Sequence, residues 1–235
     1  MTPQAVLWDV GMTLIHPSGL VMVEELERAG AAIRIAPDVA AAALAAAAEA
    51  HRVDVPCDIT RAQAVGRAWG SILGLAPDIA VAAWQRCTAR TDLYRDRDEQ
   101  AVDVLTRLRE RGVRLAVVSN DDKGTVREEL LAFGLLEFFE VVVGSNLIGC
   151  EKPEPRIFAT ALDRIGCRPH EVWFVGDGVL NDIFGAFAAG IAKPILYDRF
   201  GIHTSLPCAR VTKLRGVLDL MNEATSEEVR CVSAC

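Results

Sequence analysis

Residues able to do chemistry cluster just after the short apolar runs of this 235-residue chain. The clusters are Asp9 to Thr13, Ser119-Asn120, Lys152-Pro153, Gly176-Asp177 and Asn181-Asp182. Together they supply carboxylates, hydroxyls and one ammonium group. Such groups can hold an anion in place and balance charge that develops during a reaction.

The elements that must position these groups follow from the apolar pattern. Five short runs lack polar alternation, which is typical of strands covered on both faces: Ala5–Trp8, Arg114–Val118, Val141–Val143, Val172–Val175 and Pro194–Tyr197. Amphipathic stretches predict helices between them at Glu99–Arg111, Lys123–Phe133, Glu154–Ile165 and Asn181–Ala189. This alternation predicts an α/β fold with a doubly wound, Rossmann-like parallel sheet. In such sheets ligands bind at the carboxyl ends of the strands, so the clusters are predicted to form one site.

Residues 20 to 95 break the alternation, because they show helical periodicity and no strand pattern. Helices are predicted at Leu20–Ala29, Pro37–Arg52, Thr60–Leu73 and Pro77–Ala89, with two of them starting at a proline, which the first helical turn tolerates. We therefore predict an α/β core over residues 1–16 and 96–222, with an all-helical insert over 17–95. The polar, aperiodic residues 223–235 are predicted to form a flexible tail.

Composition limits the classes of function. Hydrophobic residues make up 51% of the chain and the net charge is −7, which fits a globular protein with no electrostatic reason to bind nucleic acid or an anionic membrane. No apolar run reaches the roughly 20 residues of a membrane helix, and the N-terminal residues do not resemble a signal peptide. Seven scattered cysteines without metal-ligand spacing favour a cytoplasmic location. The oligomeric state stays open.

The clusters together resemble the haloacid dehalogenase (HAD) superfamily. That family has a DxDxT-type first motif, a serine or threonine ending the second strand, a lysine third motif and a GDxxxxD fourth motif. The corresponding segments here are DVGMT at 9–13, VVSN at 117–120, EKPEPRIF at 151–158 and VGDGVLND at 175–182. Their order and strand context match, and the helical insert matches the family's α-helical cap.

The resemblance implies a role for each site residue. Asp9 would be the nucleophile that forms an aspartyl-phosphate, and Lys152 would balance the charge of Asp9 and the phosphoryl group. Thr13, Ser119 and Asn120 would bind the substrate. Mg²⁺, which prefers hard oxygen ligands, would be held by an Asp9 oxygen, the backbone carbonyl of Gly11 and Asp177, with Asp182 close by.

Gly11 departs from the family pattern. Phosphatases of the family usually carry a second aspartate here, which protonates the leaving group and later activates water; such a group contributes roughly 10²–10⁴ in rate. Three explanations stay open. The substrate has a good leaving group, another residue such as His16 supplies the acid, or the protein turns over phosphoesters poorly.

The resemblance therefore implies a Mg²⁺-dependent hydrolase, a phosphatase acting on a small phosphorylated, anionic metabolite. Two alternatives remain. One is haloacid dehalogenase-type hydrolysis, against which Asp177 argues, since metal-independent dehalogenases of the family typically replace that acid. The other is a catalytically weak HAD fold with a binding or regulatory role.

Overall fold

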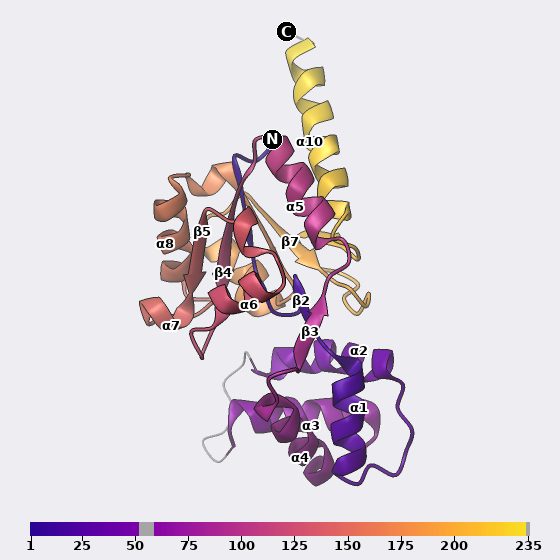
Figure 1. Ribbon diagram of the computed structural model, residues 1–235. Coiled ribbons are helices and arrows are strands. Elements are labelled where there is room, and N and C mark those ends of the chain that lie inside the picture. The colour runs from indigo at the N-terminus through magenta and orange to yellow at the C-terminus, as the bar shows by residue number, and fades with distance from the viewer. Residues whose placement is uncertain (52–58, 234–235) are drawn as a thin grey trace. The chain divides into compact units, whose positions relative to one another are not determined.

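The computed structural model describes residues 1–51 and 59–233, which divide into two compact units. One unit combines Met1–Leu14 with Arg97–Cys235, and the other is Ile15–Asp96 (Figure 1). We call them the core unit and the helical unit. The sequence placed the corresponding boundaries after residue 16 and after residue 95.

The core unit is built on a six-stranded sheet in the order β5-β4-β1-β6-β7-β8, and every neighbouring pair is parallel. The strands are β1 (Ala5–Trp8), β4 (Arg114–Ser119), β5 (Val141–Gly144), β6 (Val172–Gly176), β7 (Lys193–Tyr197) and β8 (Ala209–Val211). The predicted parallel sheet is thus confirmed. Its apolar runs are buried along almost their whole length, because helices cover both faces.

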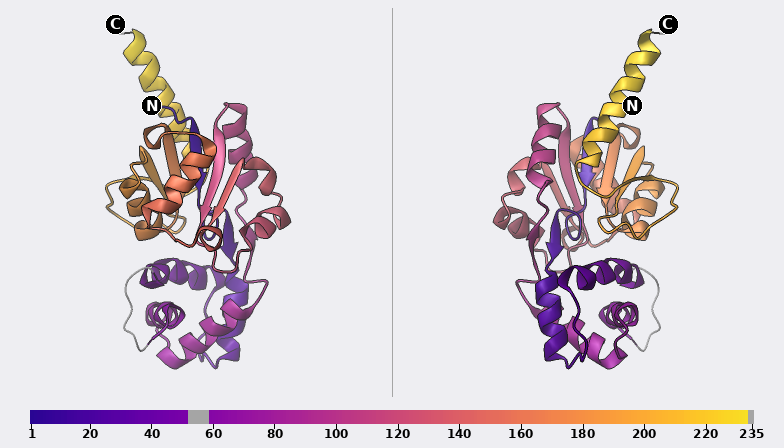
Figure 2. Two further views of the ribbon diagram at one scale, coloured as in Figure 1. Left: turned by 90° about the vertical axis from the view of Figure 1, so that its left-hand side faces the viewer. Right: turned by 90° about the vertical axis from the view of Figure 1, so that its right-hand side faces the viewer.

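Helices α8 and α9 cover one face of this sheet, and α5 and α10 lie on the other (Figures 1 and 2). The helices of the core unit are α5 (Ala101–Glu110), α6 (Val126–Ala132), α7 (Ser145–Ile148), α8 (Pro155–Ile165), α9 (Gly185–Ala188) and α10 (Gly216–Ser233). Under α8, Phe158 and Phe174 meet edge to face with ring centroids 5.3 Å apart. The apolar cluster around them also contains Leu7 of β1 and Val118 of β4. It therefore fixes the strands from which the candidate site residues extend.

The helical unit contains α1 (Gly19–Arg28), α2 (Pro37–Ala47), a 3₁₀ turn (Ala48–His51), α3 (Arg61–Leu73) and α4 (Pro77–Ala89). Pro37 and Pro77 begin their helices as predicted, and Thr60 caps α3 by accepting from the Gln63 amide at 3.2 Å. In the core of the helical unit, the rings of Trp69 and Trp84 meet edge to face with their centroids 6.0 Å apart. Arg52 of the predicted second helix lies outside the described residues. Within the described ranges, no helix is long and apolar enough to cross a membrane.

A short ribbon of β2 (Ile15–Pro17) and β3 (Tyr94–Arg97) was not predicted. All four residues of β3 are exposed, so this strand carries no apolar signal in the sequence. Its backbone pairing alone defines it.

The predicted flexible tail over residues 223–235 is wrong for most of its length, because α10 continues to Ser233. Met221 and Ala224 are buried, which anchors the first turns of α10. Further along, the hydroxyl of Thr225 donates to the Met221 carbonyl at 3.0 Å, and that of Ser226 to the Asn222 carbonyl at 2.8 Å. Burial of Met221 and Ala224 therefore stabilises the earlier part of a helix that the sequence pattern of residues 223–235 does not reveal. Residues 234–235 lie outside the described ones.

Candidate active site

Strand register brings the predicted site residues to one edge of the sheet. Trp8 pairs with Val117 of β4 on one side and with Val175 of β6 on the other. Asp9 follows Trp8 directly, and its amide donates to the Val175 carbonyl at 2.9 Å. The carboxyl ends of β1, β4 and β6 thus lie together, as the sequence predicts for parallel strands.

Three carboxylates meet at this edge. One oxygen from each of Asp9, Asp177 and Asp182 lies within 4.8 Å of the other two. The Thr13 hydroxyl, fully buried, donates to Oδ1 of Asp177 at 3.3 Å. The sheet therefore brings Asp9 and Asp177, which are 168 positions apart in the sequence, into one acidic cluster.

Lys152 lies between two of these carboxylates. Its Nζ is 2.5 Å from Oδ1 of Asp9 and 2.6 Å from Oδ1 of Asp182, and its side chain is only 3% exposed. The ammonium also lies 5.6 Å from the centroid of the Phe174 ring. A buried ammonium is stable here because two buried carboxylates compensate for its lost hydration.

Burial and neighbouring charge shift the pKa values in this cluster. Burial raises the pKa of Asp9, and the negative charge of Asp182 adds to that rise against the opposing effect of Lys152. Burial alone would lower the pKa of Lys152, but Asp182 and Asp9 hold it above its usual value. Lys152 is thus kept as a cation.

Asp182 is positioned by a tight backbone arrangement. It lies in a π-helical turn, Val179–Phe184, and its Oδ2 accepts from the Gly178 amide at 2.7 Å. At Gly176 a Cβ atom would lie 2.5 Å from the Asp182 carboxyl carbon, so only glycine leaves room for this carboxylate. The two glycines of the VGDG segment therefore serve the placement of Asp182, a role that sequence reasoning did not assign to them.

The remaining predicted residues lie at the same edge of the sheet but differ in their burial and contacts. Ser119 is buried at the end of β4, and Gly11 lies partly exposed in the loop after β1. The side-chain amide of Asn120 forms hydrogen bonds with the backbone of Lys152. The assignments of Thr13, Ser119 and Asn120 to substrate, and of the Gly11 carbonyl to metal, stay predictions.

The chemistry of the donors fits a hard divalent cation. Asp9, Asp177 and Asp182 offer carboxylate oxygens, the ligands that Mg²⁺ prefers. The three carboxylates outnumber the one ammonium that the structure describes among them, that of Lys152. Both carboxylate oxygens of Asp182 already accept hydrogen bonds, Oδ1 from the Lys152 ammonium and Oδ2 from the Gly178 amide. Asp9 and Asp177 are therefore better placed to bind Mg²⁺ directly.

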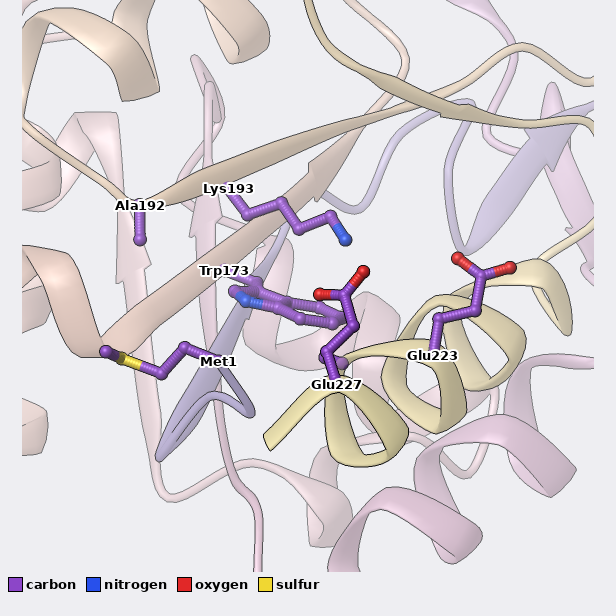
Figure 3. Close-up of a pocket in the computed structure, with 7 residues that line it drawn as sticks. Met1, Trp173, Ala192, Lys193, Glu223 and Glu227 are labelled. Carbon is purple, nitrogen blue, oxygen red and sulfur yellow. The ribbon is translucent and has the colours of Figure 1, made fainter. Parts of the chain in front are cut away.

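A separate hollow of about 210 Å³ lies at the other end of the strands, where β6 and β7 begin. Figure 3 shows the Lys193 side chain reaching over Trp173, with Glu223 and Glu227 approaching from α10. The Lys193 ammonium lies 4.5 Å from the centroid of the Trp173 ring. This hollow contains none of the predicted site residues.

Comparisons with known proteins agree on one family. A model of haloacid dehalogenase-like hydrolases matches residues 3–190. A glyceraldehyde 3-phosphate phosphatase of Methanothermobacter thermautotrophicus is 42% identical over 85 residues, which are 36% of this chain and 38% of that relative. A phosphoserine phosphatase of Thermus thermophilus is 38% identical over 100 residues, 43% of this chain and 40% of that relative. The matched segments thus span about two fifths of these curated relatives.

A solved structure extends the likeness to nearly the whole fold. The magnesium-bound HAD-hydrolase YfnB from Bacillus subtilis superposes with a TM-score of 0.66 at 19% identity, covering 94% of this chain and 100% of that one.

Proposed function

Given that the chain belongs to the haloacid dehalogenase-like hydrolase family, we propose that it is a Mg²⁺-dependent phosphatase that hydrolyses small phosphorylated metabolites through an aspartyl-phosphate at Asp9. The observation that carries this proposal is the buried Lys152 ammonium held between Asp9 and Asp182, beside a third carboxylate. The relatives named as phosphatases of small phosphorylated compounds support the substrate class.

The reaction has two steps. A carboxylate oxygen of Asp9 attacks phosphorus, so that an oxygen–phosphorus bond forms while the bond to the leaving oxygen breaks, and the leaving group departs as an oxyanion that takes up a proton from solvent. Water then attacks the phosphorus of the aspartyl-phosphate, which releases inorganic phosphate and the Asp9 carboxylate. The water protons pass to solvent or to the departing phosphate.

The residues around Asp9 supply positioning and charge. Lys152 orients the Asp9 carboxylate and offsets negative charge on the phosphoryl group, while Thr13 and Ser119 supply hydroxyl donors. Asp9 and Asp177, with the Gly11 carbonyl, would hold Mg²⁺, which when bound neutralises phosphoryl charge. We assign the helical unit as the cap, from its place in the chain between β1 and β4. The expected cytoplasmic location stays a prediction.

Dependence on metal tests this function. Phosphate release from p-nitrophenyl phosphate is expected with Mg²⁺, to stop with a strong chelator and to return when Mg²⁺ is added in excess. Asp177→Asn should collapse the affinity for Mg²⁺ and so raise the Mg²⁺ concentration needed for activity, while Asp163→Asn, a matched change at an exposed position of α8, should leave it unaltered. Chelator-insensitive turnover of a haloacid would favour dehalogenase chemistry. Absence of turnover on every phosphoester would favour a binding protein.

Gly11 predicts a second property, the preference for good leaving groups. Without a carboxylate at position 11, aryl phosphates are expected to be hydrolysed far faster than alkyl phosphates, because an aryl oxide leaves without a proton. Gly11→Asp should raise alkyl phosphate hydrolysis by about 10-fold or more, measured as kcat/KM. Equal rates for both esters in the wild type would show that another group supplies the proton.

A further inference from the structure

We propose that Asn120 is a positioning residue for Lys152, which it fixes through the backbone, and that it does not act by contacting the substrate. The kinetic part of this inference rests on the phosphatase function proposed above. The geometric part rests only on the contacts of the core unit.

A single side-chain amide binds both backbone groups of Lys152. Oδ1 of Asn120 accepts from the Lys152 amide at 2.7 Å, and Nδ2 donates to the Lys152 carbonyl at 3.0 Å. The pair resembles one rung of a sheet ladder between residues that are 32 positions apart. It fixes the place of the Lys152 backbone, and the two bonds together set the orientation of the Asn120 amide.

The loop that carries Asn120 is itself anchored. The amide of Asp121 donates to the Ser145 hydroxyl at 2.8 Å, at the start of α7. The Asp121 carboxylate accepts from the amides of Thr125 and Val126 at 3.0 and 3.1 Å, at the start of α6. Asn120 therefore connects Lys152 to a loop held at the end of β4, on the same sheet edge as Asp9.

Such anchoring matters because the lysine side chain is long and has many rotamers. Its Nζ must reach two carboxylates at 2.5 and 2.6 Å at once, and a displacement of its backbone changes both distances. Catalytic groups must be held within about 0.5 Å of their productive geometry. Asn120 supplies that restraint at the backbone end of Lys152.

The test compares Asn120→Ala and Asn120→Asp with a matched control, Asn146→Ala. Asn120→Asp keeps an acceptor for the Lys152 amide but faces the Lys152 carbonyl with an oxygen, and it preserves size if the alanine variant folds poorly. Asn146 is exposed, and its Nδ2 also donates to a loop carbonyl, that of Asp122, at 3.1 Å. Crystal structures of all forms measure the position of Lys152 Nζ, and kcat/KM is measured on p-nitrophenyl phosphate.

Both Asn120 variants are expected to displace Lys152 Nζ by more than about 0.5 Å and to lower kcat/KM by about 10–100-fold, the usual cost of losing such a supporting contact. Asn146→Ala should do neither. In the Lys152→Ala background, Asn120→Ala should cause little further loss, because its effect passes through Lys152.

An unmoved Lys152 Nζ in both Asn120 variants would overturn the inference. So would an Asn120→Ala loss as large in the Lys152→Ala background as in the wild type, which marks a direct substrate contact. If the wild type hydrolyses no phosphoester, the proposed function fails, and the Nζ positions alone decide the role of Asn120.

Discussion

Asp9→Asn is expected to lower kcat for p-nitrophenyl phosphate by about 10⁴-fold or more, since removal of a nucleophile abolishes the covalent route. An amide is nearly isosteric with the carboxylate and can still accept from Lys152, so the fold should persist. Burial already raises the pKa of Asp9, so a neutral group at this position relieves an unfavourable desolvation. Thermal unfolding, read beside kcat, separates loss of the nucleophile from loss of structure.

Asp163→Asn on the exposed side of α8 is the control for this change and should keep wild-type kcat. Wild-type turnover in Asp9→Asn, with the sequence of the purified variant verified by mass spectrometry, would contradict the covalent mechanism.

Lys152→Met is expected to have the second largest effect. It removes the ammonium between Asp9 and Asp182 while keeping much of the side-chain volume. Loss of this charge from a buried site should lower kcat/KM by about 10²–10³-fold, as for other groups that stabilise developing charge. Breaking a buried ion pair on one side also costs about 3–5 kcal/mol in the free energy of unfolding, measured by urea denaturation without metal.

Lys193→Met provides the matched control. Lys193 is another lysine of the core unit, and it lies over the Trp173 ring where β7 begins, away from the acidic cluster. Its removal should change kcat/KM by less than about twofold, as is usual away from the chemistry. Equal losses in both lysine variants would mean that Lys152 has no special part in the reaction.

The sheet and its reactive edge could be predicted because their signals are local. Runs such as Val172–Val175 are apolar throughout, and parallel pairing then brings every strand end to the same side. Asp9 and Asp177 are therefore neighbours in space although the sequence between them is long. Once the strands were recognised, the acidic cluster followed from their order and direction.

Other features depend on contacts that no local pattern reveals. The strand Tyr94–Arg97 is exposed and charged, so only its pairing with β2 defines it. The π-helical turn around Asp182 was predicted as ordinary helix, because its distinction lies in a backbone bond from the Ile183 amide to the Gly178 carbonyl, five residues earlier, at 3.1 Å. The resemblance of the second motif implied substrate binding for Asn120, which stays a prediction, but nothing local indicated that its side chain binds the backbone of Lys152, 32 residues away.

Trapping of the phosphorylated enzyme tests the central claim most directly. The protein is mixed with Mg²⁺ and p-nitrophenyl phosphate, quenched in acid within the first turnovers, and treated with borohydride, which reduces an aspartyl-phosphate to homoserine. Peptide mass spectrometry should then find homoserine at position 9 in the wild type and unmodified asparagine in Asp9→Asn. Modification at another residue, or turnover by the wild type with position 9 unmodified throughout, would contradict an aspartyl-phosphate at Asp9.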